Sequence, residues 1–326
     1  MERRVGVLGM GRWGEAWCRV LGGEPSATVA TVAGRRAVGR TDLGDARRVA
    51  HFREAIELGG LDAVIVTLPI ELHLPAIRVA VARGVPVLCE KPLVPNRRHL
   101  QEVAEVAAAA STPVLVDQNY RFRPWARAVR EHLPAIGRLE EVRIRFAQPE
   151  FTDGGRARLA HPLLADMAIH HLDLLRFLTG AEATVRSVTA ARPDDCAYEG
   201  LASVDAGLEL DGGARVSYEA TWAARRELTP WDGDWVFRGR DGELRVSDLA
   251  VDLHLDSGEE PRRVATTRPP QADEDLGVAW RDFVAACEGD SSAGITVADN
   301  VRSMNLVFDL AEAAGVPDPS APVGSR

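Results

Sequence analysis

Hydrophobic residues in the first 120 positions form short runs separated by amphipathic stretches. The apolar runs lie at residues 4–8, 27–33, 61–68, 85–90 and 113–119. They are almost continuously apolar, which is typical of strands buried on both faces. Helical spacing of apolar residues lies between them, at 45–58, 72–83 and 96–110. Strands that alternate with helices predict a doubly wound parallel sheet.

The pattern changes from about Gly137 onward. Strand-like segments follow one another with Gly and Asp turns between them, and residues 211–213 and 240–243 carry hairpin signals. Such a series predicts a large, mostly antiparallel open sheet in an α+β domain. Helices are expected near 161–178, 273–287 and 297–314. The fold class is therefore α/β, with domains at 1–120 and 121–326.

Composition narrows the class of protein. A chain of 326 residues is longer than one core usually serves, which supports two domains. The net charge is -9 and no long basic run is present, so nucleic acid is not an expected partner. The four cysteines form no CxxC pair, which argues against a metal site or a disulfide framework and predicts a cytoplasmic protein. No segment reaches membrane-spanning length, so no membrane partner is expected.

The first apolar run leads into the glycine motif Gly9-Met10-Gly11-Arg12-Trp13-Gly14, which is followed by a helical pattern. A strand, GxGxxG and a helix together predict a Rossmann dinucleotide site. Gly9 suits the tight turn, Gly11 lets the backbone approach a pyrophosphate, and Gly14 allows close packing of helix and strand. A glycine-rich turn without a ligand is the alternative, and the flanking elements disfavour it.

The end of the second strand indicates which dinucleotide binds. An NAD site usually carries an acidic residue about 20 positions after the glycines. Here Gly34 occupies that position, and Arg35 and Arg36 follow. A guanidinium can bind a 2′-phosphate, and no carboxylate repels it. We therefore expect NADP, with NAD less favoured.

Polar residues follow three of the predicted parallel strands. These segments are Thr67-Leu68-Pro69, Glu90-Lys91-Pro92 and Gln118-Asn119. Ligands of doubly wound sheets lie at the carboxyl ends of the strands. Lys91 is therefore predicted to lie beside the cofactor crevice.

The helix predicted near 161–178 carries Asp166, His170 and Asp173, which recur at +4 and +7 and would share one face. Such a row suggests a cleft. The alternative is an interior histidine with Asp173 as a packing or capping anchor. His171 lies next to His170, but adjacent histidines point to different faces, so no metal is expected.

The glycine motif, the EKP segment and the DxxxHxxD pattern, in this order, resemble the glucose–fructose oxidoreductase, inositol dehydrogenase and MocA family. Further stretches that carry the resemblance are Thr67-Leu68-Pro69 with His73, QNYRFRP, ATWAAR and ADNVRSM. The resemblance covers nearly the whole chain. It implies a Rossmann domain, an α/β domain with an open sheet, and NAD(P)-dependent oxidation or reduction of sugars and cyclitols.

The resemblance also implies roles for individual residues. Lys91 matches the catalytic-site lysine, His170 the acid/base histidine, and Asp166 the acid that binds substrate or supports His170. Asn119 and Tyr120 match the lining of the nicotinamide pocket. An imidazole has an ordinary pKa near ~6.5, which suits proton transfer near neutral pH, and Lys91 can stabilise alkoxide charge.

The candidate residues form two sets. The predicted cofactor-binding residues are Gly9, Gly11, Arg12, Trp13, Gly14, Gly34, Arg35, Arg36, Thr67, Leu68, Pro69, His73, Glu90, Lys91 and Asn119. The predicted substrate-binding residues are Lys91, Tyr120, Asp166, His170 and Trp231. Trp231 belongs to an aromatic loop expected to overhang the substrate; packing between subunits is the alternative.

One segment departs from the family pattern. Residues 161–165 replace glycines that usually precede the first Asp, and Ala168 replaces the glycine after it. The bulkier residues reshape the expected pocket, so an imine or a nucleotide-linked keto-sugar stays open as substrate. A cofactor-binding regulator without catalysis is a further alternative, which the presence of both Lys91 and His170 disfavours. An exposed apolar sheet face would need a cover, so we expect a homo-oligomer, a dimer or tetramer, through the C-terminal sheet.

Overall fold

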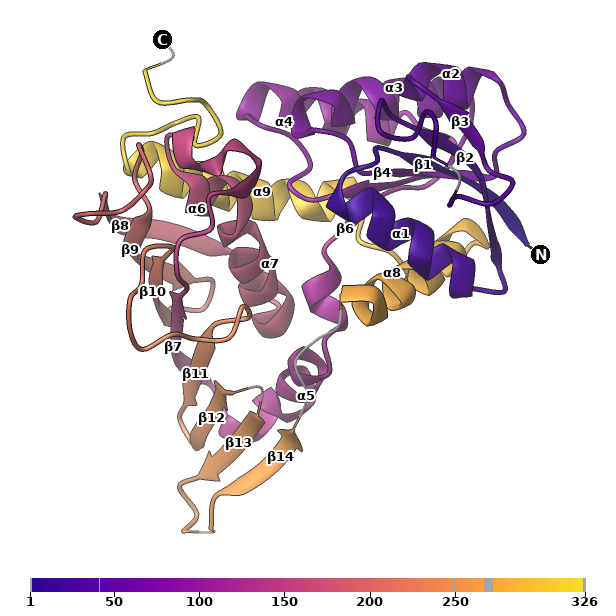
Figure 1. The fold of residues 1–326 in the computed structure, drawn as a ribbon. Coiled ribbons are helices and arrows are strands. Elements are labelled where there is room, and N and C mark those ends of the chain that lie inside the picture. Colours follow the sequence, from indigo (N-terminus) through magenta and orange to yellow (C-terminus); the bar gives the residue numbers. More distant parts are fainter. Residues whose placement is uncertain (1, 41, 249, 259, 267–271, 325–326) are drawn as a thin grey trace. The chain divides into compact units, whose positions relative to one another are not determined.

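The computed structural model describes residues 2–40, 42–248, 250–258, 260–266 and 272–324 (Figure 1). It divides into one unit of Met1–Asn119 with Gln271–Arg302 and another of Tyr120–Pro270 with Ser303–Arg326. The sequence prediction divided the chain only once, at 120 and 121. The structure differs because the chain returns to the first unit, where the Trp280 indole donates to the Ser26 hydroxyl at 2.9 Å.

The first unit is a six-stranded sheet in the order β3-β2-β1-β4-β5-β6, with every pair parallel. Its strands are β1 Arg3–Leu8, β2 Ala27–Ala33, β3 Arg47–Val49, β4 Ala63–Val66, β5 Val87–Glu90 and β6 Val114–Asp117. Its helices are α1 Arg12–Gly23, α2 Phe52–Glu57, η1 Ile70–Leu72, α3 His73–Ala82, α4 Arg97–Ala108, α8 Ala272–Cys287 and the start of α9 Val297–Ala313. Helices α2, α3 and α4 cover one face of the sheet, and α1 and α8 cover the other (Figure 1). The predicted doubly wound sheet is confirmed.

The helix predicted over 45–58 is wrong in its first half. Residues Arg47–Val49 form β3 beside β2, and α2 begins only at Phe52. The His51 side chain caps α2 by accepting from the Arg53 backbone amide. A three-residue edge strand is too short to show a period of its own, so the apolar spacing of α2 extended across it.

The second unit is an eight-stranded sheet in the order β14-β13-β12-β11-β7-β10-β9-β8. Its strands are β7 Leu139–Ala147, β8 Ala183–Ala191, β9 Ser203–Leu210, β10 Arg215–Thr221, β11 Asp234–Gly239, β12 Gly242–Ser247, β13 Ala250–Leu255 and β14 Arg262–Thr266. Its helical elements are η2 Asn119–Phe122, which starts at the last residue of the first unit, α5 Pro124–His132, η3 Leu133–Ile136, η4 Asp153–Arg158, α6 Pro162–Asp166, α7 Ala168–Thr179 and the rest of α9. All pairs are antiparallel except β7 with β10. The mostly antiparallel sheet predicted from the sequence is confirmed.

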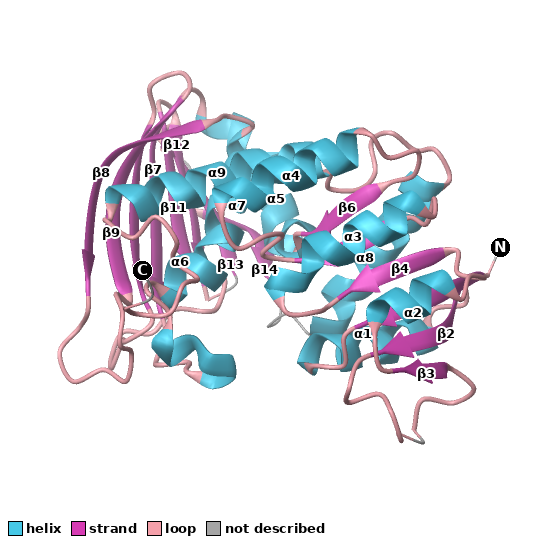
Figure 2. Ribbon diagram, turned by 90° about the horizontal axis from the view of Figure 1, so that it is seen from above, coloured by secondary structure: helices cyan, strands magenta, loops and turns pink. Residues whose placement is uncertain are grey.

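One face of this sheet lies away from the helices (Figure 2). The exposed side chains along its strands are mainly polar or charged. Buried and exposed residues alternate along β10, and the exposed ones are Arg215, Ser217 and Glu219. Arg238 pairs with Glu141 at 3.0 Å and with Glu243 at 2.5 Å, which joins three neighbouring strands by ion pairs. The sequence predicts an exposed apolar face on this sheet, but these strands expose polar and charged side chains instead. The homo-oligomer stays a prediction, without the apolar surface on which it was based.

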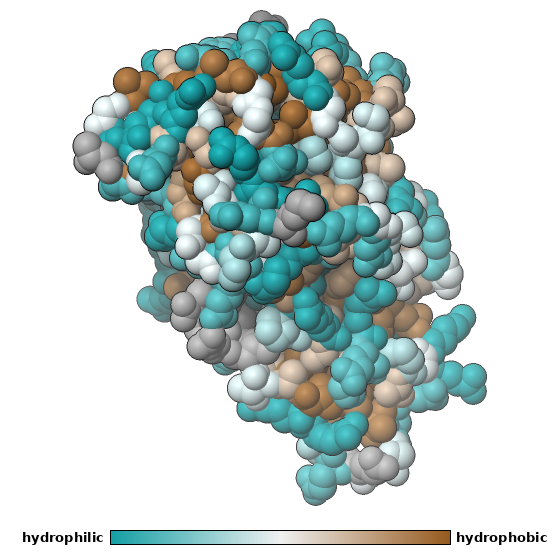
Figure 3. Space-filling model, turned by 90° about the vertical axis from the view of Figure 1, so that its right-hand side faces the viewer, coloured by the Kyte–Doolittle hydropathy of each residue, from teal (hydrophilic) through white to brown (hydrophobic). Residues whose placement is uncertain are grey.

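The surface in Figure 3 is mainly hydrophilic, with smaller hydrophobic patches between the polar side chains. Among the helices of the described residues, none combines the length and the apolarity that a membrane span needs.

Candidate active site

The glycine motif builds a tight turn between β1 and α1. Gly9 has φ +116°, and a Cβ on it would lie 2.4 Å from the Thr67 carbonyl oxygen. A Cβ on Gly14 would lie 2.0 Å from the Gly9 carbonyl oxygen. A Cβ on Gly11, by contrast, would meet nothing within 4 Å, and no side chain caps the helix there. The open N-terminus of α1 at Gly11 fits a pyrophosphate, because its amide groups and helix dipole favour an anion.

The segments after β4 and β5 are fastened by side chains of the first unit. The Thr67 hydroxyl donates to the carbonyl oxygens of Leu8 and Gly9, at 3.2 and 3.0 Å. The buried His73 ring lies between two carbonyl oxygens, with Nε2 2.8 Å from Leu68 and Nδ1 3.2 Å from Leu93. Burial lowers the pKa of His73, so the ring is neutral and donates to one of them. His73 thus braces these segments, and its contact with a cofactor stays a prediction.

The end of β2 carries the predicted selector for the cofactor. Arg35 and Arg36 are exposed in the turn that follows β2. The next arginine, Arg40, is instead held by Glu15 at 2.5 Å and by Asp42. Gly34 has φ +148°, a conformation that L-residues rarely adopt, so a carboxylate side chain could not be placed there without strain.

Lys91 follows β5 and is the only lysine of the chain, beside 38 arginines. Glu90 before it is buried and accepts a hydrogen bond from the Trp17 indole at 3.2 Å. The lysine side chain ends in a compact ammonium group, whereas arginine carries a planar guanidinium. The catalytic role of Lys91 stays a prediction.

Asp117, at the end of β6, is a buried carboxyl that sequence reasoning missed. It is 2% exposed and is the register partner of Glu90 on β5. Neither of its oxygens has a hydrogen-bond partner among the described residues. Burial raises the pKa of Asp117 well above its ordinary value, and the negative charges of Glu90 and Asp275 raise it further, against the smaller effect of Lys91. The carboxyl is therefore protonated well above the pH at which an exposed aspartate ionises.

Replacing Asp117 with asparagine is expected to raise stability relative to the wild type, increasingly as the pH rises. A carboxyl whose pKa is raised by folding does not lower the free energy of unfolding below its unfolded pKa of about 4, because it is then protonated in both states. As the pH rises from there toward the pKa of the folded state, the free energy of unfolding of the wild type falls. Urea denaturation at pH 4 and pH 8 measures this difference. An equal effect of Asp117→Asn at both pH values would contradict the protonated state. Asp62→Asn, at an exposed carboxyl, is the matched control.

The predicted helix over 161–178 is interrupted at Met167, so Asp166 ends α6 while His170 lies on α7. The Asp166 Oδ2 oxygen accepts a hydrogen bond from Arg156 Nε at 2.8 Å, and Arg156 Nη2 is also 2.8 Å away. The prediction of one continuous helical face is therefore wrong. Arg156 comes from η4, and nothing in the local sequence pattern pointed to it. The role of Asp166 in catalysis stays a prediction.

Asp173 is a structural anchor, which is one of the two interpretations that the sequence pattern allows. It is 1% exposed, and both carboxylate oxygens accept from Arg121 at 2.6 Å. The Ser303 hydroxyl donates to it at 2.8 Å. His171 is structural as well: burial lowers its pKa to about 3, and its Nδ1 is 3.0 Å from the Tyr218 hydroxyl. The anchor interpretation, which the sequence had left open, holds for Asp173.

His170 is buried and stacked on Tyr120. The ring centroids are 3.8 Å apart and the planes differ by 14°. Tyr120 thus contacts the predicted acid/base residue directly, which its assignment to the nicotinamide pocket did not anticipate. Lys91 and Asn119 belong to the first unit and His170 to the second. The meeting of Lys91 and His170 accordingly stays a prediction.

Trp231 is 42% exposed, and its ring packs near Phe151 at 5.8 Å and Trp222 at 6.4 Å between centroids. Its neighbour Asp232 and the nearby Trp235 are instead fully buried. Within this loop, Trp231 is thus the residue with an exposed ring, in contrast to Asp232 and Trp235. Its contact with substrate stays a prediction.

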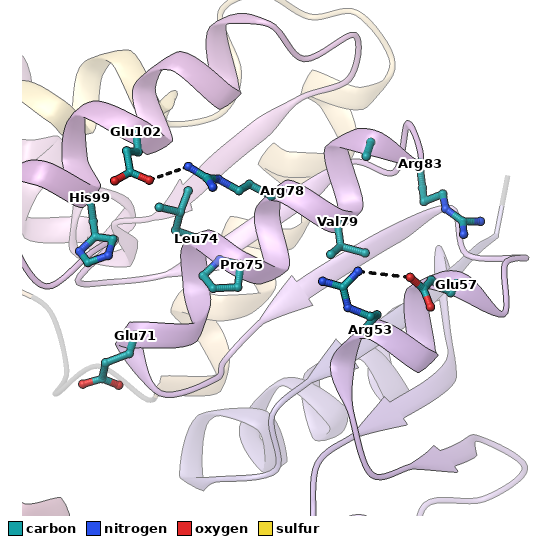
Figure 4. A pocket seen from close by; sticks show the side chains of 11 residues that line it. Arg53, Glu57, Glu71, Leu74, Pro75, Arg78, Val79, Arg83, His99 and Glu102 are labelled. Carbon is teal, nitrogen blue, oxygen red and sulfur yellow. Dashed lines mark hydrogen bonds and ion pairs between the residues drawn. The ribbon is translucent and has the colours of Figure 1, made fainter.

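A groove lined by charged and apolar side chains lies over α2, α3 and α4 (Figure 4). It has a volume of about 560 Å³. The ion pair Arg53–Glu57 lies along α2, and the pair Arg78–Glu102 joins α3 to α4. None of the predicted site residues lines it. Across the described ranges, no group of three or more His, Cys, Asp and Glu side chains is placed to hold a metal ion.

Comparison with known proteins identifies the class. Residues 3–118 match the oxidoreductase family with an NAD-binding Rossmann fold, and residues 127–245 match the GFO/IDH/MocA C-terminal domain. Inositol 2-dehydrogenase of Rhizobium meliloti is 29% identical over 96% of this chain and 96% of that protein. Inositol 2-dehydrogenase of Leifsonia xyli is 30% identical over 69% of this chain and 68% of that protein.

A solved structure shares the fold. An oxidoreductase from Agrobacterium radiobacter, in complex with NAD+, L-tartaric acid and magnesium, aligns with a TM-score of 0.86 at 20% identity and covers 97% of both chains. The fold and the matches define an oxidoreductase with an NAD-binding Rossmann domain. The chain belongs to the GFO/IDH/MocA family, which confirms the resemblance seen in the sequence.

Proposed function

We propose that this protein is an NADP-dependent oxidoreductase that acts on a secondary alcohol or ketone carbon of a sugar-like or cyclitol-like substrate. The observation that carries the proposal is the buried imidazole of His170, held in a defined plane at the start of α7. The name of the R. meliloti relative, which matches over nearly its full length, supports a cyclitol.

The proposed chemistry divides between the two units. A bound cofactor would accept the hydride from the substrate carbon as NADP+, or supply it as NADPH. In the oxidative direction His170 takes the hydroxyl proton as the C–O bond becomes a carbonyl, and it returns the proton in reduction. Lys91 donates a hydrogen bond to the same oxygen and offsets its developing negative charge. Asp166 would orient the substrate or His170, and Trp231 would pack against the substrate ring.

An activity screen tests this proposal. We expect the protein to oxidise NADPH with keto-cyclitols or ketoses, or to reduce NADP with the matching polyols such as myo-inositol. Tight NADPH binding without turnover of any keto-cyclitol, ketose, imine or nucleotide-linked keto-sugar would contradict the enzyme and favour a regulator. Turnover confined to the imines or the nucleotide-linked keto-sugars would show that the substrate belongs to that class and not to the free sugars or cyclitols.

Replacing Arg35 and Arg36 together with alanine is expected to weaken NADP binding and leave NAD binding nearly unchanged. Hydrogen bonds to charged groups contribute about 1.5–3 kcal/mol, which corresponds to roughly 10- to 100-fold in the dissociation constant. Fluorescence titration with both cofactors measures the change. Arg83→Ala, at an exposed arginine of the groove on α3, is the matched control. An unchanged ratio of NADP to NAD affinity in the double variant would rule out these arginines as the selector.

A further inference from the structure

Tyr120 has two close neighbours, one on each face of its ring. The His170 imidazole is stacked at 3.8 Å between centroids, and the Arg123 guanidinium carbon lies 3.2 Å from the same centroid. Two groups this close to one centroid would overlap if they shared a face, so they occupy opposite faces. Tyr120 is therefore clamped between a cation and an imidazole.

The guanidinium of Arg123 is itself held by a buried carboxylate. Arg123 is 6% exposed and forms an ion pair with Asp232, which is 1% exposed. The other carboxylate oxygen of Asp232 accepts from the Trp125 indole at 2.6 Å, and its backbone oxygen accepts from the Trp235 indole at 2.8 Å. Asp232 is thus fixed at three points in the interior, and neither Arg123 nor Asp232 can move without breaking buried contacts.

Arg123 supports the near-parallel stack of Tyr120 on His170 from the other face of the phenol. Aromatic pairs usually prefer an offset or edge-on geometry to a direct face-to-face sandwich. The guanidinium of Arg123 is attracted to the opposite face of the Tyr120 ring, because a cation is attracted to the negative face of an aromatic ring. This attraction holds the phenol in place. Because the phenol cannot tilt, it fixes the plane of the imidazole that rests on it.

We propose that Tyr120, Arg123 and Asp232 form a column of positioning residues that sets the orientation of His170 for proton transfer. The inference rests on the proposed function, in which His170 is the acid/base residue. Catalysis depends on such orientation, since a displacement of about 1 Å can cost up to about 10²-fold in rate. The ring of Tyr120, and not its hydroxyl group, carries the positioning.

Three variants test the column by three readouts. Tyr120→Leu removes the ring, Tyr120→Phe keeps it, and Tyr218→Phe is a control that alters the tyrosine hydroxyl beside His171 instead. NMR of the imidazole protons, assigned with His170→Ala, reports the ring-current shift that a stacked aromatic ring induces. Steady-state kinetics separates kcat from KM, and fluorescence titration gives the dissociation constant of NADP.

We expect the Leu variant to lose the ring-current shift of His170 and roughly 10- to 100-fold in kcat, a larger factor than any change in KM or in NADP affinity. The Phe variant should keep the shift and lose much less of kcat than the Leu variant. If Tyr120→Leu does not fold, Asp232→Asn removes the charge partner of Arg123 and should change the same resonance and kcat in the same direction, to a smaller extent.

Three results would overturn the column. An unmoved His170 resonance in the Leu variant would show that the rings do not stack. A moved resonance with unchanged kcat would reduce the column to packing. Equal loss of kcat in the Phe variant would assign the effect to the hydroxyl group. Absence of turnover in the wild-type protein is a different outcome, which refutes the proposed function, while the NMR readout still decides whether the stack exists.

Discussion

Lys91→Met is expected to reduce turnover by at least about 10²–10³-fold while the dissociation constant of NADP changes little. Removing a single donor from a developing oxyanion costs this much in other enzymes, because the interaction is stronger in the transition state than in the ground state. Methionine keeps much of the side-chain length and removes the charge. Single-turnover rates with NADPH and a keto substrate, with fluorescence titration of NADPH, measure the two quantities.

Lys91→Arg sharpens the prediction for Lys91. Arginine keeps the positive charge, but its planar guanidinium is bulkier and cannot release a proton near neutral pH. We expect Lys91→Arg to restore less than a tenth of the lost activity. The chain has arginine at its 38 other Lys or Arg positions, and lysine at this one alone. Arg83→Met removes an exposed charge from the same unit as control. Full activity of Lys91→Arg would mean that a positive charge alone suffices.

His170→Ala is expected to reduce kcat by roughly 10²–10⁴-fold, the range typical of losing a general base. The loss should shrink at high pH in the oxidative direction, because hydroxide can then take the proton from the substrate hydroxyl. His254→Ala, on β13 of the sheet, should keep full activity. A pH–rate profile of His170→Ala with the same shape and height as the wild type would exclude this histidine from the chemistry.

Sequence patterns predicted the features that local spacing encodes. The glycine turn is one example, since Gly9 and Gly14 are required by contacts within a short segment and with the adjacent strand. The alternation along β9 and β10 is another, because one face of the sheet is buried and the other is not. These patterns span only a few residues, so they can be recognised in the sequence without a structure.

Pairings over long distances in the chain could not be predicted in the same way. Arg123 and Asp232 form a buried ion pair although they are far apart in the sequence, and each reads as an ordinary surface charge. Asp173 looked like part of a functional row because its partners Arg121 and Ser303 come from other segments. The break at Met167 was hidden as well, because apolar residues on both sides continue a helical spacing.

The proposed function requires that Lys91 and His170 act on one reacting oxygen. A double-mutant cycle of Lys91→Met and His170→Ala on kcat/KM tests it most directly, since residues that act as a unit are not additive. We expect the double variant to lose about as much activity as the more damaged single variant. A double variant whose loss equals the product of the two single losses would show that the residues act independently and would refute a shared reacting oxygen.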